Sequence, residues 1–155
     1  MAYNNSYQRD YNQERRQQPR FDAGPQMPAE IRPLPLPEDY VDAAEAVMRS
    51  FMANKRITTT KIRNLLSLVI DIYNTESKRT EPELTLESRN ALMMARIRIA
   101  YEMGRERDTV GEFVKQAKLL EYIKDIGNDR KKLIDFAHYM EALVAYHRYL
   151  GGKES

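Results

Sequence analysis

Four cations surround three consecutive threonines in the segment "KRITTTKIRNLLSLV", residues 55–69: Lys55, Arg56, Lys61 and Arg63. The threonines can start a helix, because a threonine hydroxyl accepts a hydrogen bond from an amide of the first turn. The start of a helix carries partial positive charge, so cations in its first turn are disfavoured. A bound phosphate would reverse that sign, since free amides, hydroxyls and cations could all approach it. The segment therefore predicts a phosphate-binding surface; the alternative is that the long side chains turn into solvent at small cost.

Charge is segregated along a chain whose formal net charge is only +2. Residues 46–70 contain five cations and no carboxylate, and residues 88–101 contain three arginines and no carboxylate. In the second window Arg89 and Arg96 are seven residues apart and fall on one face of a helix. If the two windows meet in space, they form one basic patch. We predict that Arg89 and Arg96 also contact nucleic acid; the alternative is a salt bridge to an acid elsewhere in the chain.

These residues would be positioned by an all-α fold, a compact five-helix bundle with a disordered N-terminal tail. Residues 1–37 are polar, contain several prolines and lack apolar periodicity, so they predict a disordered tail. Apolar residues then recur at helical spacing and predict a helical bundle domain over residues 38–152. The first of five expected helices covers about 38–53, the second runs from Thr58 or Thr59 to about 78, and the third runs from a cap at Thr80 or Thr85 to about 106. The fourth begins at the capping box Thr109-x-x-Glu112 and ends at the "DIGND" segment, residues 125–129. The fifth runs from Asn128 or Asp129 to Gly151 and Gly152.

The sequence contains no pattern typical of an enzyme. His138 and His147 are nine residues apart and do not share a helix face at metal-ligand spacing, and the chain has no cysteine. Neither a Walker loop nor a GxGxxG or GxSxG segment occurs. Asp71 and Asp135 have no second group beside them for acid–base work. We therefore predict no catalytic activity, no cofactor and no metal site.

The sequence also predicts a cytoplasmic protein without membrane contact. Its first 20 residues lack the apolar core of a secretory signal, and no apolar stretch approaches the roughly 20 residues that a membrane-spanning helix needs. The absence of cysteine suits a reducing compartment.

Two segments resemble a known family: "ITTTKIRNLLSLVIDIYN" (57–74) and "HYMEALVAYHRYLGG" (138–152). They are similar to signature segments of the small subunit of the type III-A CRISPR effector, the Csm complex. The resemblance spans most of residues 38–152 and leaves out the tail. It implies a non-catalytic subunit, several copies of which stack head to tail as the minor filament of a ribonucleoprotein. These copies lie beside the other Csm subunits that hold the guide RNA.

The resemblance further implies contact with the phosphates of target RNA where it pairs with the guide RNA. The family's basic motif matches the four cations at residues 55–63, whereas Arg89 and Arg96 come from the charge analysis alone. No segment is typical of base-edge recognition, so binding is expected to be independent of RNA sequence and sensitive to salt.

Apolar residues that a small bundle leaves exposed are expected to form the subunit contacts: Met93, Met94, Tyr139, Tyr146 and Tyr149. The alternative function is a purely structural helical adaptor that binds protein and not nucleic acid. The RNA-contact hypothesis requires the cations to be gathered together. Ion pairs with the chain's own carboxylates would instead favour the adaptor.

Overall fold

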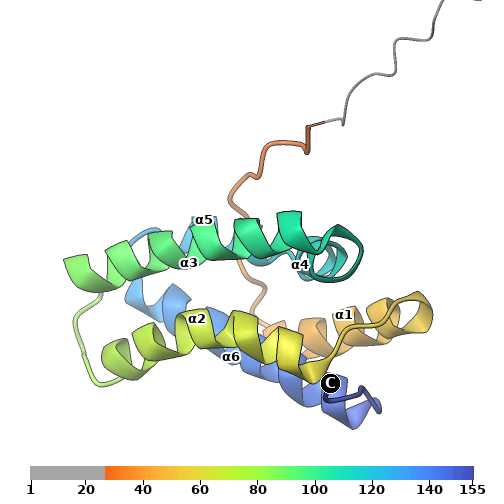
Figure 1. Ribbon diagram of the computed structural model, residues 1–155. Coiled ribbons are helices and arrows are strands. Elements are labelled where there is room, and N and C mark those ends of the chain that lie inside the picture. The colour runs from red at the N-terminus through yellow and green to blue at the C-terminus, as the bar shows by residue number, and fades with distance from the viewer. Residues whose placement is uncertain (1–26) are drawn as a thin grey trace, which may run out of the picture. The chain divides into compact units, whose positions relative to one another are not determined.

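The computed structural model describes residues 27–155 and divides the chain into two units, Met1–Glu30 and Ile31–Ser155. Residues 27–30, the described part of the first unit, carry no helix or strand. Every helix of the described residues lies in the second unit (Figure 1). Of the tail predicted over residues 1–37, the first 26 residues lie outside the described residues. The domain division at residue 37 stays a prediction.

Threonine caps begin two of the first three helices, as the sequence predicts. These helices are α1 (Tyr40–Asn54), α2 (Thr59–Glu76) and α3 (Leu86–Arg105). The Thr58 hydroxyl accepts a hydrogen bond from the Lys61 amide at 3.3 Å, and the Thr85 hydroxyl accepts one from the Ser88 amide at 3.0 Å. The first three predicted helices are therefore confirmed, with ends that differ by a few residues.

The stretch between residues 106 and 127 is not the single helix that the sequence predicts. It contains a π-helical turn (Arg107–Gly111), α4 (Glu112–Ala117) and α5 (Leu119–Ile126). Thr109 lies inside the π-helical turn and α4 has no side-chain cap, so the expected capping box is wrong. Lys118 separates α4 from α5 with a φ of 57°. With α6 (Arg130–Tyr149), the described residues form six α-helices and not five.

The break at Lys118 has a physical reason. A left-handed residue other than glycine costs about 1 kcal/mol. The change of direction lets both short helices turn their apolar sides inward. Phe113, Val114 and Ala117 of α4 are buried, and so are Leu119, Tyr122 and Ile123 of α5. Sequence periodicity alone cannot show this bend, because the apolar spacing continues across it.

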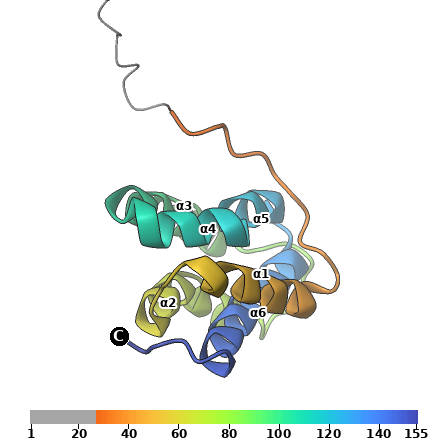
Figure 2. The same ribbon diagram turned by 90° about the vertical axis from the view of Figure 1, so that its right-hand side faces the viewer.

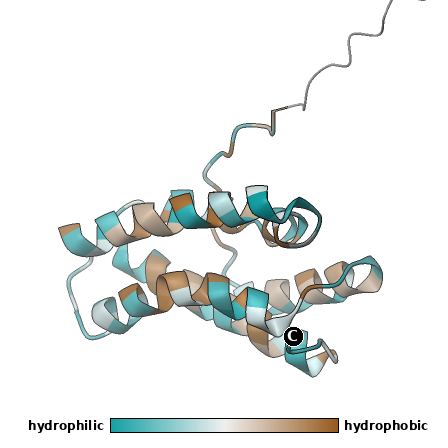
Figure 3. Cartoon of the chain, viewed as in Figure 1, coloured by the Kyte–Doolittle hydropathy of each residue, from teal (hydrophilic) through white to brown (hydrophobic). Residues whose placement is uncertain are grey.

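The helices of the second unit lie in two layers, with α1, α2 and α6 in one and α3, α4 and α5 in the other (Figures 1 and 2). Helix α6 packs along both α1 and α2, so its apolar face is at the centre of the first layer. Figure 3 shows hydrophobic residues along much of α2, whereas on α3 they alternate with hydrophilic ones. The largest fully buried side chains come from every helix of the bundle: Met48, Phe51, Ile62, Ile99, Phe113, Leu119, Ile123, Leu133, Phe136, Tyr139, Met140 and Leu143.

One of the five expected surface contacts is wrong, because Tyr139 is buried with only 1% of its surface exposed. Its hydroxyl donates a hydrogen bond to the Ala117 carbonyl at 2.8 Å, next to the break between α4 and α5. Its ring meets the Tyr122 ring edge-on, with centroids 5.4 Å apart. Burial raises the pKa of Tyr139 above its ordinary value. Met93, Met94 and Tyr149 are exposed as predicted, and Tyr146 is half-buried.

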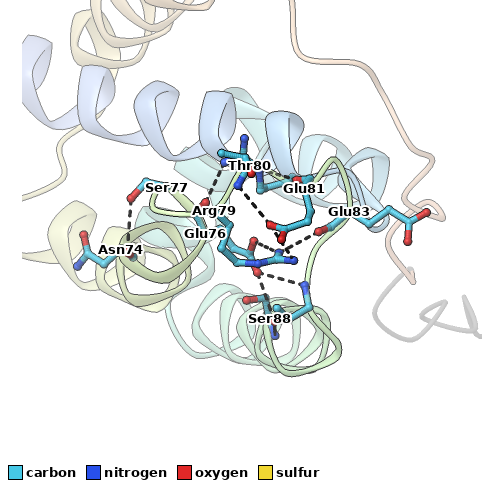
Figure 4. A network of polar contacts seen from close by, with 10 residues as sticks. Asn74, Glu76, Ser77, Arg79, Thr80, Glu81, Glu83 and Ser88 are labelled. Carbon is cyan, nitrogen blue, oxygen red and sulfur yellow. Dashed lines mark hydrogen bonds and ion pairs between the residues drawn. The ribbon is translucent and has the colours of Figure 1, made fainter.

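A fully buried carboxylate, Glu76, fixes the connection between α2 and α3 (Figure 4). The Thr85 amide and hydroxyl donate to it at 3.2 and 3.3 Å, and Arg79 pairs with it at 2.6 Å. Burial alone would raise the pKa of Glu76. Hydrogen bonds from Ser88, Arg79 and Thr85 outweigh burial and hold this pKa below its ordinary value. Glu76 thereby ties the end of α2 to the cap of α3.

Residues 31–37 run beside α5 without forming a helix or strand. The Leu34 amide donates to the Glu121 carbonyl at 3.1 Å, and Lys124 Nζ donates to the Ile31 carbonyl at 2.7 Å. These bonds fasten the segment that leads into α1.

Candidate nucleic-acid interface

The junction of α1 and α2 brings three of the four predicted cations into one groove. Lys55, Arg56 and Lys61 line it, and Lys153 faces them from the segment after α6. The groove has a volume of about 700 Å³. Arg63 lies outside it, exposed, one half-turn further along α2. The structure therefore gathers three of the four cations, and their contact with nucleic acid stays a prediction.

Three of these four cations pair with carboxylates that are distant in the sequence. Lys55 and Glu112 are 57 residues apart, and Arg63 and Glu154 are 91 residues apart. No local pattern could have revealed these partners, which sequence analysis missed. Hydrogen bonds from the lysines hold the pKa values of Glu106 and Glu112 below their ordinary range. The pairs are Lys55 with Glu112 (2.8 Å), Lys61 with Glu106, and Arg63 with Glu154 (2.8 Å).

These ion pairs are all partly open to water. The three cationic side chains are 36–56% exposed, and their carboxylate partners 28–55%. Pairs with this exposure contribute little to stability and are screened by salt.

Arg56 differs from the other three cations. It donates only to the carbonyls of Met52 (2.9 Å) and Lys55 (3.2 Å) and has no described carboxylate within 4 Å.

The first amides of α2 are not free, which corrects the expectation of an open helix end. The Thr59 amide donates to the Lys153 carbonyl at 2.9 Å, and the Thr60 amide donates to the Glu154 carbonyl at 3.0 Å. The Thr60 hydroxyl also donates to the Glu154 carbonyl, at 2.6 Å. The first amides of a helix need partners, and here the segment after α6 supplies them. An incoming phosphate would meet cationic side chains and not a bare helix start.

A buried histidine positions this segment. His147 has none of its surface exposed, and its Nε2 lies 2.7 Å from the Ile57 carbonyl. Because a carbonyl only accepts, Nε2 carries the proton, and Nδ1 of the neutral ring faces the Thr59 hydroxyl at 2.9 Å. Burial lowers the pKa of His147. The ring also packs against Gly152, where a Cβ atom would lie 2.2 Å from a ring carbon. His147 is therefore a structural residue at the base of the groove.

Arg89 and Arg96 lie in a different place. They line a second groove, between α3 and α5, and have no described carboxylate within 4 Å. The Lys61–Glu106 pair places the start of α2 beside the end of α3. At a rise of 1.5 Å per residue, Arg96 lies about 15 Å and Arg89 about 25 Å back along α3 from Glu106. The two cation-rich windows therefore do not share one groove, and contact of Arg89 and Arg96 with nucleic acid stays a prediction.

Within residues 27–155, no three His, Cys, Asp or Glu side chains lie together in a way that could hold a metal ion. His138 contacts two tyrosine hydroxyls, Tyr40 at 3.4 Å and Tyr73 at 3.3 Å. None of the described helices is both long enough and apolar enough to span a membrane.

The fold and the groove define a class: a small all-helical protein with partly exposed cations at a helix junction. The comparisons with known proteins are more specific, because a family model described as Csm2 Type III-A matches residues 35–153. The chain belongs to this family, and the resemblance found in the sequence is confirmed.

Curated relatives support the same conclusion. The CRISPR system Cms protein Csm2 of Mycobacterium tuberculosis (strain ATCC 25618 / H37Rv) is 39% identical over 122 residues, which cover 77% of this chain and 97% of that protein. The protein with the same name from Streptococcus thermophilus is 38% identical over 121 residues, 76% of this chain and 95% of that protein. The one from Enterococcus italicus is 33% identical over 96 residues, 60% of this chain and 67% of that protein.

Proposed function

We propose that this chain is a non-catalytic small subunit of a type III-A CRISPR ribonucleoprotein. In that assembly it contacts the phosphate backbone of target RNA paired with guide RNA, without reading the base sequence. Family membership supports the assembly, since the relatives are named as Csm2 proteins of a CRISPR system. The observation that carries the RNA contact is the gathering of Lys55, Arg56 and Lys61 in one groove with Arg63 beside it.

The partly exposed ion pairs allow RNA to replace the chain's own acids. Each RNA phosphate that approaches Lys55, Lys61 or Arg63 takes the place of a carboxylate that the cation already holds. The net gain at one pair is small, so affinity depends on several phosphates binding together and releasing their counterions. Arg56 has no carboxylate among residues 27–155 to exchange and is the first contact in this scheme. Binding of this kind is independent of sequence and weakens steeply with salt.

Assembly with further subunits forms the second part of the proposal. Several copies stack head to tail in the minor filament, beside the other Csm subunits and in the cytoplasm. Exposed apolar side chains support such contacts, since Met93, Met94 and Tyr149 are each more than half exposed. Exposed apolar surface of this kind marks contact sites between proteins.

The three ion pairs favour one alternative function. Cations that neutralise the chain's own carboxylates could serve only stability and solubility, in a helical adaptor that binds protein. The two functions differ in one measurable property, the affinity for RNA at low salt.

The test measures binding of labelled single-stranded and duplex RNA by fluorescence anisotropy over a series of salt concentrations. The free protein and the reconstituted complex are both titrated. Changing Lys61 and Arg63 to Ala should weaken binding about tenfold and reduce the slope of log K against log salt by up to about two. The control changes Lys78 and Arg98 to Ala, two exposed cations without a described carboxylate partner. It loses the same charge and should alter affinity less than about twofold. Absence of binding at low salt in both forms would establish the adaptor.

A further inference from the structure

The groove between α3 and α5 differs in chemistry from the groove at the start of α2. Among the described residues, three cations and no carboxylate line it: Arg89, Arg96 and Lys124, whose Nζ already donates to the Ile31 carbonyl at 2.7 Å. Its volume is about 330 Å³, and the side chains of Leu92 and Ile123 lie at its buried base. It therefore combines an apolar floor with a positively charged rim.

Apolar side chains border this groove along α3. Leu86 and Met93, which line it, are 65% and 52% exposed, and Ile97, four residues after Met93 on the same helix face, is 60% exposed. Covering such side chains is favourable for a protein partner. They are aliphatic, so they offer no aromatic platform on which RNA bases could stack. The groove thus favours an acidic protein segment with an apolar residue at its centre.

The start of α1 presents a surface of this kind on the same chain. Val41, Asp42 and Glu45 lie at the three- and four-residue spacing of one face of α1, and Glu38 lies in the turn just before the helix. Val41 is 46% exposed. Within the described residues, Glu38 and Asp42 have no cation within 4 Å, and Glu45 has only Arg49, at 3.7 Å. Lys131 of α6 is bonded to Asp135 at 2.7 Å and does not pair with these carboxylates.

We propose that the α3–α5 groove of one copy binds the acidic segment at the start of α1, residues 38–45, of a second copy. The inference deepens the proposed self-association and depends on that part of the proposed function. Val41 covers the apolar strip on α3, and the carboxylates face Arg89 and Arg96, the two groove cations without a described partner. Because the two surfaces differ, the contact is heterologous and joins copies head to tail, leaving one of each surface free at the ends. Two turns of helix bury a small area, so the contact is weak between free chains and strengthens only when copies are aligned.

Disulfide trapping tests the pairing directly, since the natural chain contains no cysteine. One chain carries Val41→Cys and the other carries Met93→Cys with a size tag, and both are kept under oxidising conditions. The mixed disulfide should form at least about fivefold faster than either self-disulfide, because only the mixed pair places the two thiols together. Equal rates for the three products would overturn the proposal.

Charge reversal then tests the chemistry of the contact. Arg89→Glu with Arg96→Glu in the Met93→Cys chain should slow the mixed disulfide at least about fivefold. Asp42→Lys with Glu45→Lys in the Val41→Cys chain should do the same, and combining the two reversed chains should restore at least about half the rate. Failure of this rescue would overturn the proposal. Thermal melting of each variant verifies that it folds.

The RNA surface supplies the matched control. Lys61→Ala with Arg63→Ala should leave the disulfide rate unchanged while it weakens RNA binding, so the two proposals fail separately. Reversal of Arg89 and Arg96 that weakens RNA binding and leaves the disulfide rate unchanged would make the groove an RNA site and overturn the self-association surface.

Discussion

The two ends of α2 use the same interaction, a cation bonded to a carboxylate, in opposite environments. At its start, Lys61 and Arg63 meet carboxylates that are 28% and 55% exposed. At its end, Arg79 meets Glu76, which is fully buried and also receives hydrogen bonds from Thr85. Exchanging the partner of an exposed ion pair changes the free energy little, whereas a buried carboxylate that loses its partners destabilises the fold strongly. The end of α2 therefore serves stability, and its start can exchange partners.

The largest effect is expected at the buried end. Glu76→Ala removes the acceptor for Arg79, the Thr85 amide and the Thr85 hydroxyl at once. We expect the free energy of unfolding to fall by about 2–4 kcal/mol, because partly buried donors are left without a partner. Urea unfolding followed by circular dichroism measures this loss.

The control for that variant is Glu141→Ala, which removes an exposed glutamate of α6. It should change the free energy of unfolding by less than about 0.5 kcal/mol. A loss at Glu76 no greater than at Glu141 would contradict the contrast between the two ends of α2.

A second large effect is expected beneath the basic groove. Gly152→Ala would place a Cβ atom 2.2 Å from the His147 ring. The ring cannot move easily, because it is buried and bonded to both Ile57 and Thr59. We expect a loss of about 1–3 kcal/mol in the free energy of unfolding. Faster amide hydrogen exchange at Thr59 and Thr60 should accompany it, since their partners at Lys153 and Glu154 would shift.

The matched substitution is Gly104→Ala, because a Cβ atom there meets nothing within 4 Å. Gly104 lies in a helix, so alanine should stabilise the protein slightly. Equal effects at the two glycines would show that the segment after α6 moves aside freely.

Local sequence patterns predicted the features that depend only on residues close together in the chain. The caps at Thr58 and Thr85 and the gathering of Lys55, Arg56 and Lys61 follow from residues close in the chain. The partners of these groups could not be predicted, because they depend on packing between distant segments.

Two features show this limit. The Lys61 carboxylate partner is 45 residues away, and the amides of Thr59 and Thr60 bond to carbonyls 94 residues later. The bend at Lys118 is invisible to periodicity, since the apolar spacing runs through it. The burial of Tyr139 is equally non-local, since its hydroxyl bonds to the Ala117 carbonyl beside the bend, 22 residues earlier.

Lowering the pH should reduce the free energy of unfolding through the groups at both ends of α2. The pKa of His147 is lowered by burial, and the pKa of Glu76 is lowered by its hydrogen bonds, which outweigh burial. A lowered pKa means that the unfolded chain binds more protons, so stability falls as the pH falls. The loss should begin below about pH 6.5 for His147 and continue below about pH 4.3 for Glu76.

Urea unfolding between pH 8 and pH 3 measures this dependence. Glu76→Gln should flatten the part of the curve below about pH 5, because no carboxylate then titrates at that position. Stability that stays constant between pH 8 and pH 4 would contradict the neutral buried state of His147.

The smallest effect on stability is expected at the exposed start of α2. Glu106→Gln with Glu112→Gln removes two carboxylates that pair with Lys61 and Lys55. The unfolding midpoint should move by less than about 3 °C, because exposed pairs contribute little. Affinity for RNA at low salt should rise severalfold, since the cations no longer exchange one anion for another.

The control for a general effect of net charge is the double variant Glu87→Gln with Glu141→Gln. These exposed glutamates have no described cation within 4 Å, so their loss changes the net charge by the same amount without freeing a lysine. If both double variants raise RNA affinity equally, net charge accounts for the effect and the groove has no special part in it. A rise in RNA affinity confined to the Glu106 and Glu112 variant would mean that these carboxylates occupy the positions that RNA phosphates take. The exposed ion pairs at the start of α2 would then exchange their anions, whereas the buried pair at its end stabilises the fold.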